Sequence, residues 1–101
     1  LYKVRDYAFN NVLIMIAADG IFDNQEKEFA EKLAKKWGYN LSKIQGMFHM
    51  AQSGKLVLRM PEDRKMREKI YKLMEKAANI DGNVCENEQH ILNSVKAQYL
   101  N

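Results

Sequence analysis

A segment that occurs twice constrains the fold of this chain more than any other feature. The first copy is Asp19-Gly20 followed by Glu26, and the second is Asp81-Gly82 followed by Glu88. The same number of residues separates each position from its counterpart. In both copies one helical pattern ends before the glycine and another begins after it. The repeat therefore predicts two similar helix–turn–helix units.

Apolar residues recur at spacings of three and four along most of the chain, which is typical of helices with one buried face. The predicted helices cover Tyr2–Ala18, Asp23 to Gly38, Asn40 or Ser42 to Gln52, Pro61–Ile80, and Cys85 or Glu86 to Tyr99. Pro61 is expected at the first helical position. Between the third and fourth of these helices, residues 55–60 form a connector that is either extended or a short turn. No run alternates with a period of two for long enough to demand a sheet, so we expect an all-α bundle of five or more helices.

The first predicted helix should lie at the centre of the bundle. Its inward stripe includes Asn11 and Met15, and the run from Val12 to Ala18 is apolar on every side. A helix that is apolar all round is buried all round. The length of 101 residues predicts a single domain over residues 1–101. The two Asp-Gly turns with their following glutamates, called the duplicated bends below, give it weak twofold internal symmetry.

Composition narrows the cellular setting. The longest apolar run is too short to cross a bilayer, and no signal peptide is visible. Cys85 is the single cysteine, so no disulfide forms within the chain, and a cytoplasmic location fits most easily. The chain begins at Leu1 rather than Met, so the segment could be part of a longer protein.

The acidic bends have a purely structural interpretation. Gly20 and Gly82 suit the left-handed conformation that closes a helix. Asp19 and Asp81 can accept hydrogen bonds from backbone N–H groups ahead of them. Asp23 and Glu26 have the spacing of a capping box, and Glu88 would lie in the first turn of the last helix, where carboxylates are favoured.

A functional interpretation stays open beside it. Aspartate at a helix C-terminus faces the negative end of the helix dipole, so its occurrence in both copies suggests paired carboxylates that serve a basic partner or a divalent metal. An ordinary calcium-binding EF-hand is excluded, because Met15 and Ala17 occupy the upstream ligand positions of the first copy. The candidate surface consists of Asp19, Asp23, Glu26, Asp81 and Glu88.

At these residues the chain resembles the bacterial tellurite-resistance TerB-like family, which also includes the N-terminal region of certain membrane-anchored J-domain co-chaperones. The matching residues are Ile16–Gly20, Phe22-Asp23, Glu26, Leu33-Ala34, Trp37–Tyr39, Ala77–Gly82, Val84 and Glu88. The resemblance implies an all-helical domain with pseudo-twofold halves, whose acidic residues face a shared surface that binds metal or partners. It does not imply tellurite resistance, because the biochemical activity of the family is poorly defined.

Two other features of the sequence are candidate sites. Cys85 precedes a helix start, where it is either a reactive thiol or a substitute cap. Residues 55–72 are the most basic part of the chain and suggest nucleic acid or an anionic surface. Interleaved acidic residues and the lack of an aromatic pattern for base stacking argue against this.

The sequence thus predicts a non-enzymatic interaction or stress-response module with an unknown protein partner. Divalent-metal binding by the same carboxylates is the first alternative, and nucleic-acid or anionic-surface binding through residues 55–72 is the second. The oligomeric state stays open.

Overall fold

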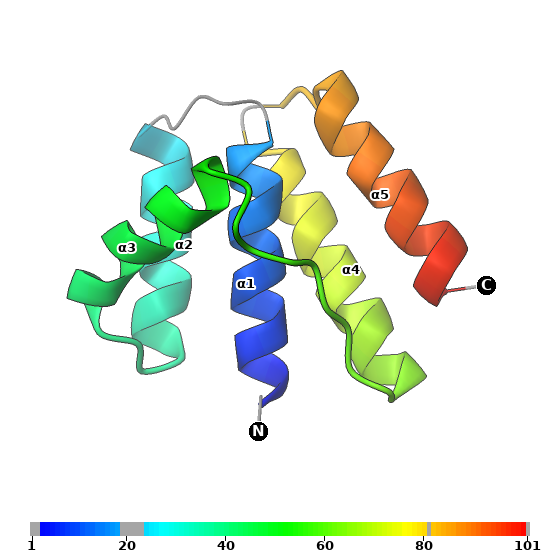
Figure 1. Cartoon of the computed structure of the whole chain (residues 1–101), viewed down its shortest axis with the longest axis horizontal. Helices are drawn as coiled ribbons and strands as arrows, with labels where there is room; N and C mark the ends of the chain where they lie inside the picture. Colours follow the sequence, from blue (N-terminus) through cyan, green and yellow to red (C-terminus); the bar gives the residue numbers. More distant parts are fainter. Residues whose placement is uncertain (1–2, 19–23, 81, 101) are drawn as a thin grey trace.

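The computed structural model describes residues 3–18, 24–80 and 82–100, and these form five helices with no strand among them. The helices are α1 (Val4–Ala17), α2 (Asn24–Lys36), α3 (Leu41–Gln52), α4 (Arg64–Ala78) and α5 (Glu86–Tyr99) (Figure 1). The predicted all-α class is confirmed. No helix of the described part is both long enough and apolar enough to span a membrane.

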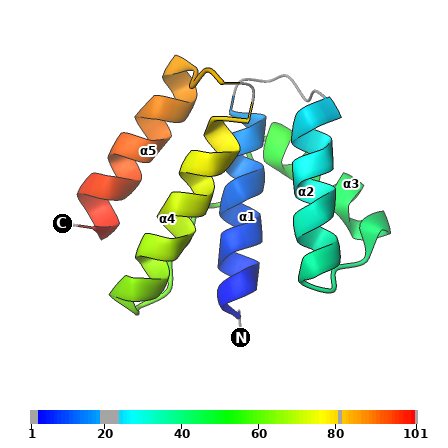
Figure 2. The same cartoon turned by 180° about the vertical axis from the view of Figure 1, so that it is seen from behind.

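Helix α1 occupies the centre of the molecule. Helices α2 and α3 lie on one side of it and α4 and α5 on the other, as both faces of the molecule show (Figures 1 and 2). Helix α1 packs against α2, α3 and α4, whereas α5 packs mainly against α4. The side chains of Phe9, Leu13 and Ile16 are completely buried, so the predicted central position of this helix is confirmed.

Local side-chain chemistry sets the helix ends. Asn40 accepts a hydrogen bond from the N–H of Ser42 at 3.0 Å and caps α3, as expected. Asp63 does the same for α4 by accepting from the N–H of Lys65 at 2.8 Å. Helix α4 therefore begins at Arg64, and the prediction that Pro61 is its first residue is wrong. An aspartate side chain satisfies one of the N–H groups that a helix start leaves open, which Pro61 cannot do.

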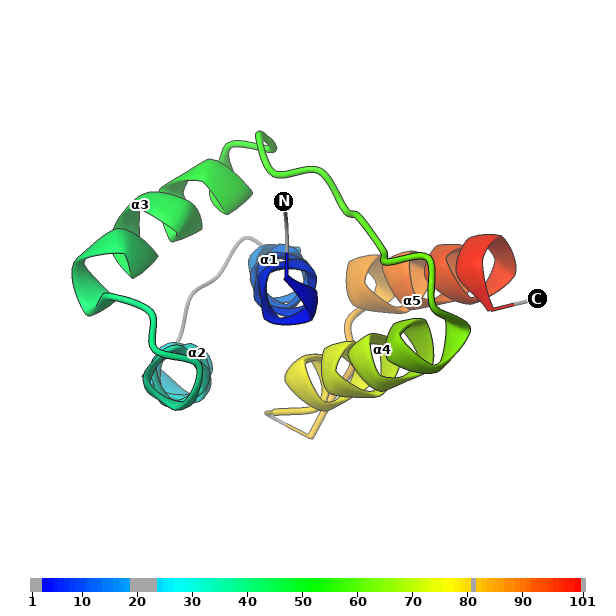
Figure 3. The same ribbon diagram turned by 90° about the horizontal axis from the view of Figure 1, so that it is seen from below.

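Residues 55–60 are extended rather than turned, which settles the alternative that the sequence left open. The segment leaves α3, crosses the face of α1 and enters α4 (Figures 1 and 3). Its side chains alternate in exposure: Lys55, Val57 and Arg59 are exposed, and Leu56, Leu58 and Met60 are partly buried. This period of two is that of a β-strand.

Candidate functional site

Of the predicted acidic surface, only the two glutamates belong to the described part of the chain. Glu26 is 6% exposed and Glu88 is 5% exposed, so both are buried. The expectation that they face outward on an acidic surface is wrong for these two residues. Asp19, Gly20, Asp23 and Asp81 lie outside the described residues, so their predicted roles stay predictions.

Glu88 has a structural role at the start of α5. Its Oε1 accepts a hydrogen bond from the N–H of Cys85 at 2.9 Å, and the Cys85 sulfur accepts from the N–H of Glu88 at 3.4 Å. This reciprocal pair is a capping box in which cysteine replaces the usual serine. Burial raises the pKa of the Cys85 thiol. The hydrogen bond to its sulfur makes Cys85 a helix cap, which is one of the two roles expected from the sequence. The raised pKa makes the thiol a poor nucleophile at neutral pH.

The first turn of α5 lies beside the end of α1. The Asn87 side-chain amide donates a hydrogen bond to the carbonyl oxygen of Ala18 at 3.2 Å, which ties the first turn of α5 to the end of α1. Gly82 has a φ of +83° and donates its N–H to the Asn79 oxygen at 2.9 Å, so it forms the predicted turn. Within the described ranges, no three His, Cys, Asp or Glu residues are grouped so as to hold a metal ion.

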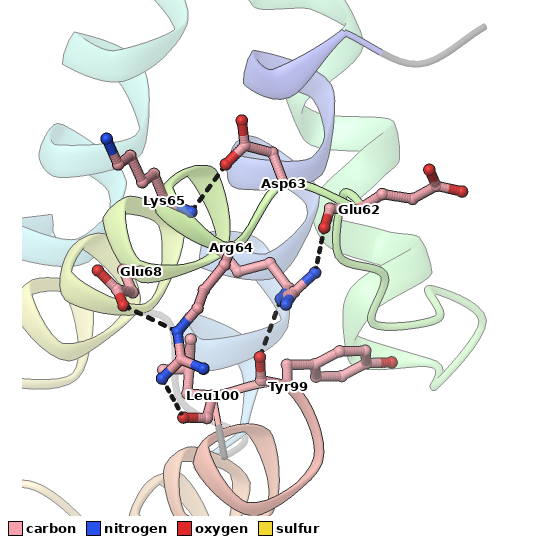
Figure 4. Close-up of polar contacts among 8 residues, drawn as sticks. Glu62, Asp63, Arg64, Lys65, Glu68, Tyr99 and Leu100 are labelled. Atoms are coloured by element: carbon pink, nitrogen blue, oxygen red, sulfur yellow. Dashed lines mark hydrogen bonds and ion pairs between the residues drawn. The ribbon is translucent and has the colours of Figure 1, made fainter.

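Part of the basic stretch is committed to holding α5. Arg64 donates to the Leu100 carbonyl oxygen at 2.9 Å and pairs with Glu68 at 3.2 Å (Figure 4). Arg67 donates to the Tyr99 oxygen at 2.9 Å and to the carbonyl oxygens of residues 61 and 62. Carbonyls at a helix C-terminus lack partners within the helix and carry partial negative charge, so guanidinium groups suit them. These two arginines are thus structural rather than available to a phosphate backbone.

A groove opens between α1, α3 and the extended segment 55–60. It encloses about 660 Å³. Its apolar lining is Tyr7, Met47, Met50, Leu56 and Val57, and its polar lining is Asp6, Asn10, Tyr39, Lys55 and Arg59. Val57 is 62% exposed and Met50 is 42% exposed, although both are large apolar residues. Exposed apolar side chains beside a concavity mark sites where another molecule binds.

Two asparagines on α1 hold the extended segment beside the groove. Asn10 Nδ2 donates to the Val57 oxygen at 2.9 Å. Asn11, which is fully buried, donates to the Arg59 oxygen at 2.8 Å and accepts from the Arg59 N–H at 3.3 Å. The sequence placed Asn11 on the buried stripe without a partner. The adjacent pair Asn10-Asn11 in an apolar helix could have indicated this role, because a buried amide needs hydrogen-bond partners.

A second wall of the groove is polar and lies at the start of α1. The Tyr39 hydroxyl donates to the Asp6 carboxylate, which also accepts from the N–H of Lys3 at 2.9 Å. These hydrogen bonds, the one from Tyr39 foremost, lower the pKa of Asp6, while burial and Asp6 raise the pKa of Tyr39. The Tyr39 ring stacks on Phe9 with centroids 4.8 Å apart. The Arg5 guanidinium lies over the same Tyr39 ring, 5.5 Å from its centroid. Tyr39 is thus held by a hydrogen bond, a ring stack and a cation–π contact.

Comparison with known proteins gives no relative: no family model, no curated protein and no solved structure matches the chain.

Proposed function

We propose that this protein is a non-enzymatic interaction module that binds a short segment of another protein in the groove between α1, α3 and residues 55–60. The observation that carries the proposal is the exposure of Met50 and Val57 on the rim of a 660 Å³ concavity. A volume of this size accommodates a few side chains of a partner. Methionine side chains such as Met47 adapt their shape to different ligands, which suits a binding surface.

The lining of the groove supports binding rather than catalysis. Its described residues include no histidine or cysteine, and the carboxylate of Asp6 accepts a hydrogen bond from the Tyr39 hydroxyl. A lowered pKa keeps Asp6 ionised at neutral pH, so it is a weak general base. The described part of the groove thus offers apolar contact and hydrogen bonds, which are the means of recognition.

Selection from a displayed library of random peptides tests the proposal. The wild-type protein should enrich a defined set of sequences, and the double variant Met50→Glu plus Val57→Glu should lose them, because two charges would occupy the apolar rim. Val4→Glu plus Leu41→Glu is the matched control, since these residues are similarly exposed but lie outside the groove. Enrichment that survives in the groove variant, or no enrichment by the wild type, would refute the proposal.

We also propose that the chain is a TerB-like domain. Helix pairs α2–α3 and α4–α5 flank α1 on opposite sides (Figure 2). The hydrogen bond between Asn87 and Ala18 joins the start of α5 to the end of α1. This arrangement supports a pseudo-twofold relation between the halves. A bacterial stress-response role follows from the resemblance alone.

Divalent-metal binding near the duplicated bends is the second candidate. The hydrogen bond from Asn87 to Ala18 favours it, because it joins the end of α1, which precedes Asp19, to the first turn of α5, which contains Glu88. Calorimetric titration with calcium, magnesium, zinc and manganese tests it on the wild type and on Asp19→Asn plus Asp81→Asn. Heat of binding that the double variant loses supports a site there, whereas no heat, or equal heat from both proteins, removes the candidate.

A further inference from the structure

Among the described residues, none makes a hydrogen bond to one of the two backbone edges of the extended segment 55–60. The peptide groups of Val57 and Arg59 meet Asn10 and Asn11. In an extended chain, the N–H and C=O of residues two apart point to the same side. Those of Leu56 and Leu58 therefore point to the opposite side, and neither residue makes a backbone hydrogen bond within the described part of the chain.

An extended backbone with an open edge is a template for strand pairing. The segment is prepared for this role, because the hydrogen bonds to Asn10 and to the buried Asn11 fix it before any partner arrives. Leu56, which carries part of the open edge, also lines the groove. Prior fixation lowers the entropic cost of binding.

The exposed side chains of the segment indicate the chemistry of the partner. Lys55, Val57 and Arg59 form its exposed row, in the order basic, apolar, basic. Side chains directly opposite each other on paired strands contact one another, and opposite charges across the pair are favourable. A complementary strand would present an acidic, an apolar and an acidic residue at alternate positions.

The same row argues against a second copy of this chain as the occupant. Antiparallel pairing of two such segments centred on Val57 would place Lys55 of each opposite Arg59 of the other, and parallel in-register pairing would place each base opposite itself. Like charges directly opposite are destabilising. Basic residues that flank an open edge are a recognised means of preventing self-association.

We infer that the partner of this protein is an extended peptide of the pattern acidic–x–apolar–x–acidic, which adds a strand to the edge formed by Leu56 and Leu58. The inference deepens the proposed function and rests on the same site. A peptide set from the display experiment with a different pattern, such as basic or helical sequences, would contradict this inference and leave the proposed function standing.

Synthetic peptides test the inference directly. The probe is a capped, fluorescently labelled peptide with the core Asp-Thr-Ile-Thr-Asp, and the controls have the cores Lys-Thr-Ile-Thr-Lys and Asp-Asp-Ile-Thr-Thr. Fluorescence anisotropy should show the acidic alternating probe binding about tenfold more tightly than either control, as two cross-strand ion pairs allow. Binding should weaken as salt is added, because the charges are exposed.

Charge reversal identifies the row that the probe contacts. Lys55→Glu plus Arg59→Glu should reverse the preference, so that the lysine peptide binds better than the aspartate peptide. Lys43→Glu plus Lys96→Glu makes the same change in net charge at exposed positions on α3 and α5, and should preserve the preference. Circular dichroism confirms that both variants are folded.

Backbone methylation distinguishes a paired strand from other bound shapes. Single N-methyl groups at successive probe residues should weaken binding by about tenfold at every second residue and by less than about twofold between them, because alternate N–H groups face the edge. Uniform losses, equal binding of the three peptides, or no binding of the acidic probe at about 1 mM would overturn the inference.

Discussion

The residue that most shapes the candidate site is Asn11, a buried amide in an otherwise apolar part of α1. It is fully buried, and its amide group makes two hydrogen bonds to the backbone of Arg59. Asn11→Ala should lower the free energy of unfolding by about 2–4 kcal/mol, because the backbone groups of Arg59 would lose their partners and a small void would form. Urea unfolding measures this loss.

Asn10→Ala serves as the control for Asn11→Ala. Asn10 is half-buried and makes one hydrogen bond to the segment, so its loss should be about 1 kcal/mol or less. If the segment is held as described, Asn11→Ala should also weaken binding of the acidic probe. Equal stability losses in the two variants would contradict the assignment of the larger role to Asn11.

Asp6 makes the stability of the protein depend on pH in a defined direction. Its pKa is lowered in the folded state, chiefly by the hydrogen bond from Tyr39, so its contribution is present above the unfolded-state pKa. This contribution to the free energy of unfolding is lost as the pH falls from about 4, the unfolded-state pKa, through the lower pKa of Asp6 in the folded state. Tyr39→Phe keeps the ring on Phe9 and removes only the hydroxyl.

The pH dependence of Tyr39→Phe separates this ionic hydrogen bond from ring packing. At pH 7 the variant should be less stable than wild type by about 1 kcal/mol, a value that allows for solvent screening. At about pH 2.5 the difference should shrink, because protonation of Asp6 removes most of the advantage in wild type as well. Urea unfolding at both pH values measures it, and a difference that does not change with pH would assign the effect to packing.

At the scale of elements, the sequence predicted what depends on neighbours along the chain. Asn40, Gly38 and Cys85 set helix ends in the predicted places, because caps act over three or four residues. The predicted start of α4 at Pro61 is wrong, because both proline and aspartate are common at helix starts and the sequence does not show which of them the helix uses. The groove was not predicted at all, because it depends on how the segment 55–60 crosses α1.

Helix α5 depends on contacts from the basic stretch 55–72, for which the sequence left anionic-surface binding as the second alternative. Arg67 joins the Tyr99 carbonyl oxygen to the residues that precede α4. Arg67→Met should therefore lower the free energy of unfolding by about 1–3 kcal/mol and increase hydrogen exchange in the last turn of α5. Arg64→Met should have a smaller effect, because Arg64 is exposed whereas Arg67 is half-buried. Unchanged exchange near Tyr99 in Arg67→Met would contradict this tie.

For the whole molecule, the central position of α1 determines how the two sides share stability. Helices α2 and α3 contact one side of α1, and α4 contacts the other side. Helix α5 packs mainly on α4 (Figure 3). A packed interior transmits the loss of one element to its neighbours. The helices on opposite sides of α1 should therefore unfold together, in one cooperative transition.

The single tryptophan makes this cooperativity measurable. Trp37 lies at the end of α2, with its ring 6.3 Å from that of Phe9 on α1, so its fluorescence reports on the α2 side. Leu92 is buried on α5, on the other side of the molecule. Leu92→Ala should lower the free energy of unfolding by about 2–4 kcal/mol, and the fluorescence and circular dichroism transitions should shift to the same urea concentration. Ser94→Ala, an exposed change on the same helix, should leave both transitions in place. A fluorescence transition that stays fixed while the circular dichroism transition moves would mean that α1 does not couple the two sides.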